Sequence, residues 1–265
     1  MTPLVSFFII IIIVGFVTAG LKIQFDRFFA IILLISLMSF PVFQAINIFL
    51  WIIFFGAIYV LWQNREKIKN IPPKNKNKFL TVVPLLALIG ASLGSFVFFN
   101  ISSKFLLITI SIIALLYGLR LIFIHFKPEE LNHDSAKLTY QKICGLFGPV
   151  VSGFFTGLSG TSLKPLKLPF AIKIGHMNMS QVYIGNTITA LYSSLFAIII
   201  HSLYVVKNIS MTINDFLLGI SLWFGIHIVF KITEKFFKNE WRKIFQIIIG
   251  IILIIVFFKL ISSVI

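Results

Sequence analysis

Long apolar stretches recur from one end of this chain to the other, interrupted by polar clusters, proline and glycine. Several approach or exceed the roughly 18 residues that an α-helix needs to cross a bilayer. Of the 265 residues, 58% are hydrophobic and only 12% are charged. A water-soluble fold of this size could not bury so many apolar side chains. The sequence therefore predicts an all-α integral membrane protein.

The interruptions divide the chain into ten apolar segments, five on each side of the polar stretch His125–Lys142. In the first half the segments are 3–21, 28–39, 42–62, 79–99 and 103–124. In the second half they are 143–158, 166–177, 179–206, 214–230 and 244–262. We therefore divide the chain into a first membrane repeat (1–126), a cytoplasmic connecting loop (127–142) and a second membrane repeat (143–265).

Short sequence echoes occur in the same order in both halves, as a duplication predicts. The pairs are Gly15-Phe-Val-Thr-Ala19 with Gly153-Phe-Phe-Thr-Gly157, Phe29-Ala30-Ile31 with Phe170-Ala171-Ile172, and Pro41–Asn47 with Gln181–Thr187. Their common order and nearly constant offset indicate two related halves.

The loop charges predict how the halves are oriented. Gln63–Lys78 carries six Lys and Arg residues and Lys231–Lys243 carries five, whereas the corresponding loops of the other half are nearly free of charge. The positive-inside rule places both basic loops in the cytoplasm. Because they follow the third segment of one half but the fourth of the other, the halves must have opposite orientations. The sequence predicts inverted repeats of five segments, with the first two segments of each forming a hairpin.

The second-half hairpin is the first candidate for a site. At 1.5 Å per residue, Ile143–Leu158 and Leu166–Met177 would span about 24 and about 18 Å, less than the roughly 30 Å of the hydrocarbon core. We expect this hairpin to turn back within the membrane at Ser159–Pro165. Irregular backbone at such depth requires surrounding protein or a water-filled cavity.

The distribution of charge favours an anionic substrate. All eight acidic residues lie in loops or at segment ends, whereas several basic residues fall within the apolar segments. These basic residues are Lys164, Lys167, Lys173, His176, His201 and His227. Intramembrane carboxylates usually mark cation sites and proton relays, so a cation transporter of that kind is disfavoured. We interpret His201 and His227 as structural, and we expect Arg120 to extend to the cytoplasmic face.

The predicted substrate-binding residues converge on the hairpin tip. Pro165 favours the start of a helix, and the N–H groups of a helix start attract an oxyanion. Lys164 adds a positive charge, and a helix broken at Gly185 would aim a polar pair at the same cavity. The predicted residues are Ser159, Gly160, Thr161, Ser162, Lys164, Asn186, Thr187 and, from the first half, Asn47.

Each of these features also has a purely structural interpretation. The small residues of the tip would also permit close helix packing, and the polar pair Asn186-Thr187 could make ordinary interhelical hydrogen bonds. Lys167 and Lys173 could extend to the lipid headgroups.

The chain resembles the TauE/SafE permeases, the exporters of sulfite and organosulfonates. The resemblance rests on Gly153-Phe-Phe-Thr-Gly157-Leu-Ser-Gly160, followed by Pro165 or Pro169, and on Tyr183-Ile-Gly-Asn186-Thr187. Pro84–Leu121, with Gly90, Gly94 and Tyr117-Gly118-Leu119, resembles the end of the family's first half. Where the family has a glycine triplet after Gly160, this chain has Thr161-Ser-Leu-Lys164. The resemblance implies a sulfur-containing oxyanion as substrate.

We therefore expect a permease of the cell membrane that moves a small anion by alternating access. Its expected partners are the anionic substrate and the lipid bilayer; nucleic acid is not expected, and the sequence permits a homo-oligomer. No paired carboxylates and no H-E-x-x-H or G-x-S-x-G motif are present, so we expect no enzyme activity, catalytic residue, cofactor or metal site. The alternatives are a membrane-embedded accessory subunit or enzyme without transport activity, and a permease for a neutral solute.

Overall fold

The computed structural model describes residues 3–21, 28–69, 78–124, 138–204, 210–237 and 239–264. Within these ranges the regular secondary structure is helical and no strand occurs. The first half comprises α1 (Pro3–Leu21), α2 (Phe28–Leu37), α3 (Val42–Gln63), α4 (Arg65–Lys69), the π-helical turn η1 (Lys78–Val82), α6 (Val83–Asn100) and α7 (Ser103–Phe123). The second half comprises α8 (Leu138–Ser159), α9 (Lys164–Pro169), the π-helical turn η3 (Phe170–Ile174), α10 (Met179–Leu203), α11 (Ile213–Thr233), the 3-10 turn η5 (Glu234–Phe236) and α12 (Asn239–Ser262).

In the described ranges, seven helices are long and apolar enough to cross a membrane. They are α1, α3, α6 with the end of η1, α7, α10, α11 with η5, and α12. The helix α2 is shorter, and the apolar part of α8 extends only over Gly145–Ser159. The predicted all-α membrane protein is therefore confirmed.

The predicted segments and the observed helices agree closely except at the starts of α12 and α8. The helix α12 begins at Asn239 rather than at residue 244. The helix α8 begins at Leu138, so residues 138–142 of the expected connecting loop are helical. Residues 127–137 of that loop lie outside the described ranges. At 22 residues, α8 is longer than the 16-residue segment expected from the apolar run.

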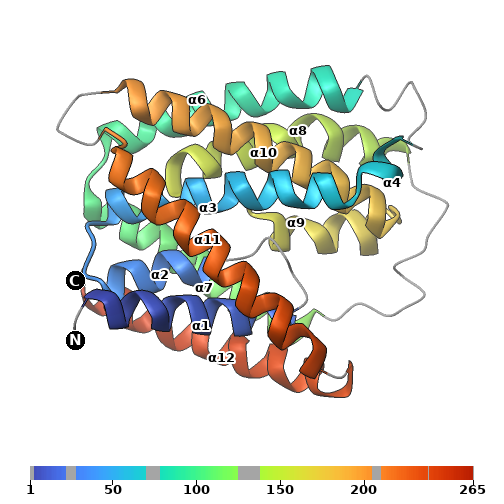
Figure 1. The fold of residues 1–265 in the computed structure, drawn as a ribbon. Coiled ribbons are helices and arrows are strands. Elements are labelled where there is room, and N and C mark those ends of the chain that lie inside the picture. The colour runs from blue at the N-terminus through green and yellow to red at the C-terminus, as the bar shows by residue number, and fades with distance from the viewer. Residues whose placement is uncertain are drawn as a thin grey trace.

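The helices form an elongated bundle in which both chain termini lie at one end and α4 lies at the other (Figure 1). We call these the terminal end and the basic end, because α4 carries exposed Arg65, Lys67 and Lys69. In the bundle α10 packs against α3 and α6, while α11 packs against α1 and α3. The helices α7 and α12 contact each other, and α1 also contacts α12.

The closest contact between helices joins α6 and α8, and glycine makes it possible. A Cβ atom added at Gly90 or Gly94 would collide with the backbone of α8, and one added at Gly153 or Gly157 would collide with the backbone of α6. Helices in membranes associate through such small residues because backbones can then approach closely. These glycines of the resemblance motif are therefore packing residues.

Candidate functional site

The hairpin tip is held by two left-handed backbone positions and a small hydrogen-bond network. Gly160 has φ +74° and Leu163 has φ +48°, and between them the chain reverses from α8 into α9. The Ser152 hydroxyl donates to the Ser162 carbonyl at 3.0 Å, and the Lys167 ammonium donates to the Ser152 hydroxyl. Lys167 thus lies across the hairpin, whereas Lys173 is exposed.

Lys164 provides a buried cation at the base of this tip. Its side chain is only 2% exposed, and Nζ lies 3.7 Å from the centroid of the Tyr183 ring. An ammonium over an aromatic face is stabilised by the ring quadrupole, more strongly where water is excluded. Tyr183 belongs to α10, one helical turn before Asn186 and Thr187. The structure therefore places Lys164 beside the part of α10 that carries the predicted polar pair.

The hydroxyl groups of the predicted site differ in whether they already have a hydrogen-bond partner within the protein. Ser159 Oγ donates to the Phe155 carbonyl at 2.9 Å, and Thr187 Oγ1 donates to the Tyr183 carbonyl at 2.8 Å. These two hydrogens satisfy carbonyls of their own helices. Thr161 is 5% exposed, and its Oγ1 has no hydrogen-bond partner among the described residues. Thr161 is therefore a buried hydroxyl of the predicted site that can still bind a ligand, and Ser162, also predicted, is half-buried beside it.

The helix α10 is continuous from Met179 to Leu203, so the expected break at Gly185 does not occur. A single glycine costs a helix about 1 kcal/mol relative to alanine, and the packing of a long helix can offset that cost. Asn186 and Thr187 therefore lie on a regular helix, where Asn186 is half-buried and Thr187 is buried.

Asn47 lies near the end of α8, on the side of the hairpin away from Asn186. Its Oδ1 is 2.9 Å from His201 Nδ1, and His201 Nε2 donates to the Gly157 carbonyl at 3.1 Å. Fifteen residues of α10 separate Asn186 from His201, which corresponds to about 22 Å. The structure therefore brings Lys164 to the region of Asn186, but it does not bring Asn47 to that pair.

The acidic residues whose side chains the structure describes, Glu66, Asp215 and Glu234, all lie at helix ends. Asp215 is 2% exposed and forms a capping box with Thr212 at the start of α11. Gln44 Nε2 also donates to Asp215 Oδ1 at 3.1 Å. Asp215 thus has a structural role as a helix cap.

This assignment of Asp215 can be tested. We expect Asp215→Asn to lower the free energy of unfolding by about 1 kcal/mol through the weakened cap and to leave the effect of sodium on unfolding unchanged. Thermal unfolding measured in sodium and in potassium buffers would check both statements. Stabilisation of the parent by sodium that is lost in the variant would instead identify Asp215 as a cation ligand.

Two features of the site were not predicted. Tyr183 precedes Asn186 by three residues, so the i, i+3 spacing could have placed it on the same helix face. Arg120, in the last turn of α7, is only 7% exposed, so its side chain packs within the protein. The i, i+3 spacing places it on the same helix face as buried Tyr117. An apolar run does not show which of its faces turns inward, and that is why the burial of Arg120 was missed.

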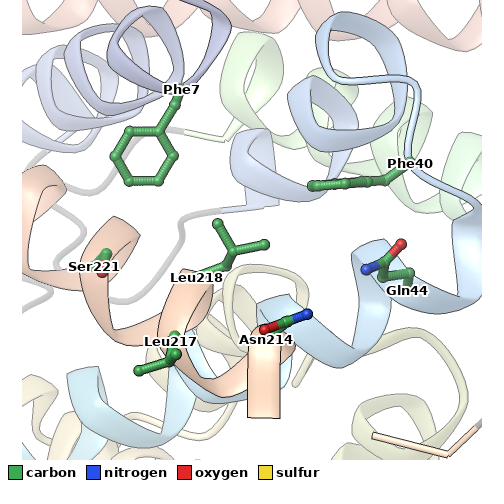
Figure 2. A pocket seen from close by; sticks show the side chains of 7 residues that line it. All are labelled: Phe7, Phe40, Gln44, Asn214, Leu217, Leu218 and Ser221. Carbon is green, nitrogen blue, oxygen red and sulfur yellow. The ribbon is translucent and has the colours of Figure 1, made fainter. Parts of the chain in front are cut away.

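A cleft of about 500 Å³ opens at the terminal end between α1, the start of α3 and the start of α11. Figure 2 shows two Phe rings and two Leu side chains around it, with the amides of Gln44 and Asn214 and the hydroxyl of Ser221. The residues that line it are Phe7, Phe40, Gln44, Asn214, Leu217, Leu218 and Ser221. None of these side chains is charged, so the cleft differs chemically from the surroundings of Lys164.

Comparison with known protein families gives a match over nearly the whole chain. Residues 4–260 match the family described as "Sulfite exporter TauE/SafE". No curated protein and no solved structure matches the chain significantly.

Proposed function

The chain belongs to the sulfite exporter TauE/SafE family, and from this premise we propose that it carries a small sulfur-containing oxyanion across the cell membrane by alternating access. The family match covers nearly the whole length of the protein, and the apolar helices agree with a multi-pass membrane transporter. The substrate binds between the hairpin tip and α10, with Lys164 as the principal cation.

The observation that carries this proposal is the burial of Lys164. A lysine inside a membrane protein is costly, and such residues usually line substrate or ion pathways. The Tyr183 ring contacts the ammonium at 3.7 Å from its centroid and helps to hold it in place. A bound oxyanion would accept hydrogen bonds from Nζ and from Thr161, and such charge-assisted bonds are about twice as strong as neutral ones.

Helix packing supports two structurally related halves. The helix of the first apolar segment in each half packs on the helix of the fourth apolar segment in the other half. These pairs are α1 on α11 and α8 on α6. A Cβ atom at Gly15 would lie 3.1 Å from the Ile226 carbonyl, and one at Gly153 would lie 2.5 Å from the Ala87 carbonyl. Gly15 and Gly153 are also matched by the sequence echo. This reciprocity is what two inverted repeats would produce, and repeats of this kind commonly carry out alternating access.

Ligand-dependent thermal unfolding of the purified protein would test the proposed charge of the substrate. Methanesulfonate and dimethyl sulfone have similar size and shape but differ in charge. We expect sulfite and methanesulfonate to stabilise the protein and dimethyl sulfone to have no effect. A ligand present at 100 times its Kd stabilises the folded state by about 2.7 kcal/mol. Equal stabilisation by dimethyl sulfone would favour the neutral-solute alternative.

A further inference from the structure

His201 joins elements of both halves deep inside the bundle. Its side chain is fully buried and contacts Asn47 of α3 and the Gly157 carbonyl of α8. The ring stacks on Phe98 of α6 with centroids 4.2 Å apart, and Phe99 meets it edge-on at 5.1 Å. Four helices, α3, α6, α8 and α10, therefore meet at one imidazole.

The hydrogen-bonding capacity of the two partners determines which ring nitrogen of His201 carries a proton. A carbonyl can only accept, so His201 Nε2 must carry a proton and donate it to Gly157. The amide of Asn47 can present either its oxygen or its NH₂ group to Nδ1, because the two orientations are interchangeable. A neutral His201 can therefore satisfy both contacts at once, with Nδ1 accepting from Asn47. The arrangement requires no charge on the ring.

Along α3, this contact lies between a residue of the cleft and a residue that touches the hairpin tip. Gln44 lines the cleft (Figure 2), and Asn47 follows it by one turn of α3. Gly157 precedes Thr161 by four residues, and a Cβ atom at Gly160 would lie 3.0 Å from Phe49. The tip of the hairpin therefore rests on α3 within two turns of Gln44. A path from the cleft to Lys164 that follows α3 would cross this layer.

We propose that His201 is a positioning residue that holds the hairpin tip against α3 and so closes the Lys164 site toward the terminal-end cleft. This inference rests on the proposed function for the identity of the site that is closed. Opening the site toward the terminal end requires the Asn47–His201–Gly157 contacts to separate. Because these contacts join α3 to α8 and α10, their separation moves one half of the protein relative to the other.

Side-specific labelling of the tip tests this role. In a Cys144→Ser background, Thr161→Cys reports on the tip, and Ser263→Cys, near the C-terminus, marks which side of the membrane the terminal end faces. A membrane-impermeant maleimide is applied to intact cells and to inside-out vesicles. We expect His201→Phe, which keeps an aromatic ring but removes both hydrogen bonds, to raise labelling from the terminal side at least several-fold. Labelling from the basic side should not change.

Two further variants serve as controls. Asn47→Ala removes one contact only and should raise terminal-side labelling to a smaller extent. If His201→Phe does not fold, this variant tests the positioning role in its place. His227→Phe alters a histidine packed on Tyr59 of α3 and should leave labelling unchanged. A general loss of stability would raise labelling from both sides equally, and that result would overturn the positioning role. Terminal-side labelling within twofold of the parent in a folded variant would also overturn it.

Methanesulfonate binding separates this inference from the proposed function. If His201→Phe raises terminal-side labelling but methanesulfonate stabilises no form of the protein, the positioning role stands and the proposed anion site is wrong. If methanesulfonate stabilises the parent but labelling does not respond to His201→Phe, the anion site stands and the positioning role is wrong.

Discussion

Lys164→Gln is expected to weaken methanesulfonate binding by about 10-fold to 100-fold, while the protein still inserts and folds. The expectation follows from replacing a charged donor, whose hydrogen bond contributes about 1.5–3 kcal/mol, by a neutral donor on a side chain one bond shorter. About 1.4 kcal/mol corresponds to a tenfold change in affinity. The Kd from ligand-dependent thermal unfolding measures the effect.

Lys173→Gln is the matched control, because Lys173 lies on the same hairpin but is exposed. It should leave the Kd unchanged within about twofold. Removing the ammonium over Tyr183 also removes the cost of burying it, so the Lys164 variant should not be less stable than the parent without ligand. Parent-like binding by Lys164→Gln would show that Lys164 is not the substrate cation.

Gly94→Val should strongly destabilise the protein through the α6–α8 contact. A Cβ at this position collides with the backbone of Phe154 and Leu158, which cannot move as a side chain could. Overpacking typically costs about 1–3 kcal/mol, and here the helices must separate along a contact that extends over several turns. We expect a lower temperature of unfolding together with loss of methanesulfonate binding, because α8 carries the hairpin tip.

Leu93→Val provides the control for placing a β-branched residue in α6. Leu93 lies next to Gly94 in the same helix, and its side chain is 53% exposed. Subtracting the control's change in unfolding temperature from that of Gly94→Val leaves the change caused by separating α6 from α8. Equal unfolding temperatures for the two variants would mean that the close α6–α8 contact does not stabilise the fold.

The positions of the helices could be predicted because apolar runs and their interruptions are local features. The hairpin tip could also be located, since Gly160 and Pro165 interrupt the pattern within a few residues. The partners of the site residues could not be predicted in this way. Asn47 and His201 are 154 residues apart in the chain, and their contact depends on how α3 and α10 are rotated. The same holds for Lys164 and Tyr183, which meet only once the hairpin has folded against α10.

The chemistry of the buried polar residues also limited the prediction. Ser159 and Thr187 looked like hydrogen-bond donors for a ligand, but in the structure their hydroxyls bond to carbonyls one turn earlier. This behaviour is common for Ser and Thr within helices. Thr161 differs because it lies beyond the end of α8, so its backbone lacks the helical geometry that brings a hydroxyl to the carbonyl one turn earlier.

Flux into proteoliposomes shows whether the protein carries an anion and whether Lys164 is needed for it. Vesicles containing the parent or Lys164→Gln would be loaded with buffer and exposed to labelled methanesulfonate or labelled dimethyl sulfone. We expect saturable uptake of methanesulfonate by the parent, much slower uptake by Lys164→Gln, and dimethyl sulfone entry no faster than in protein-free vesicles. Equal methanesulfonate uptake by the parent, the variant and protein-free vesicles would contradict this expectation.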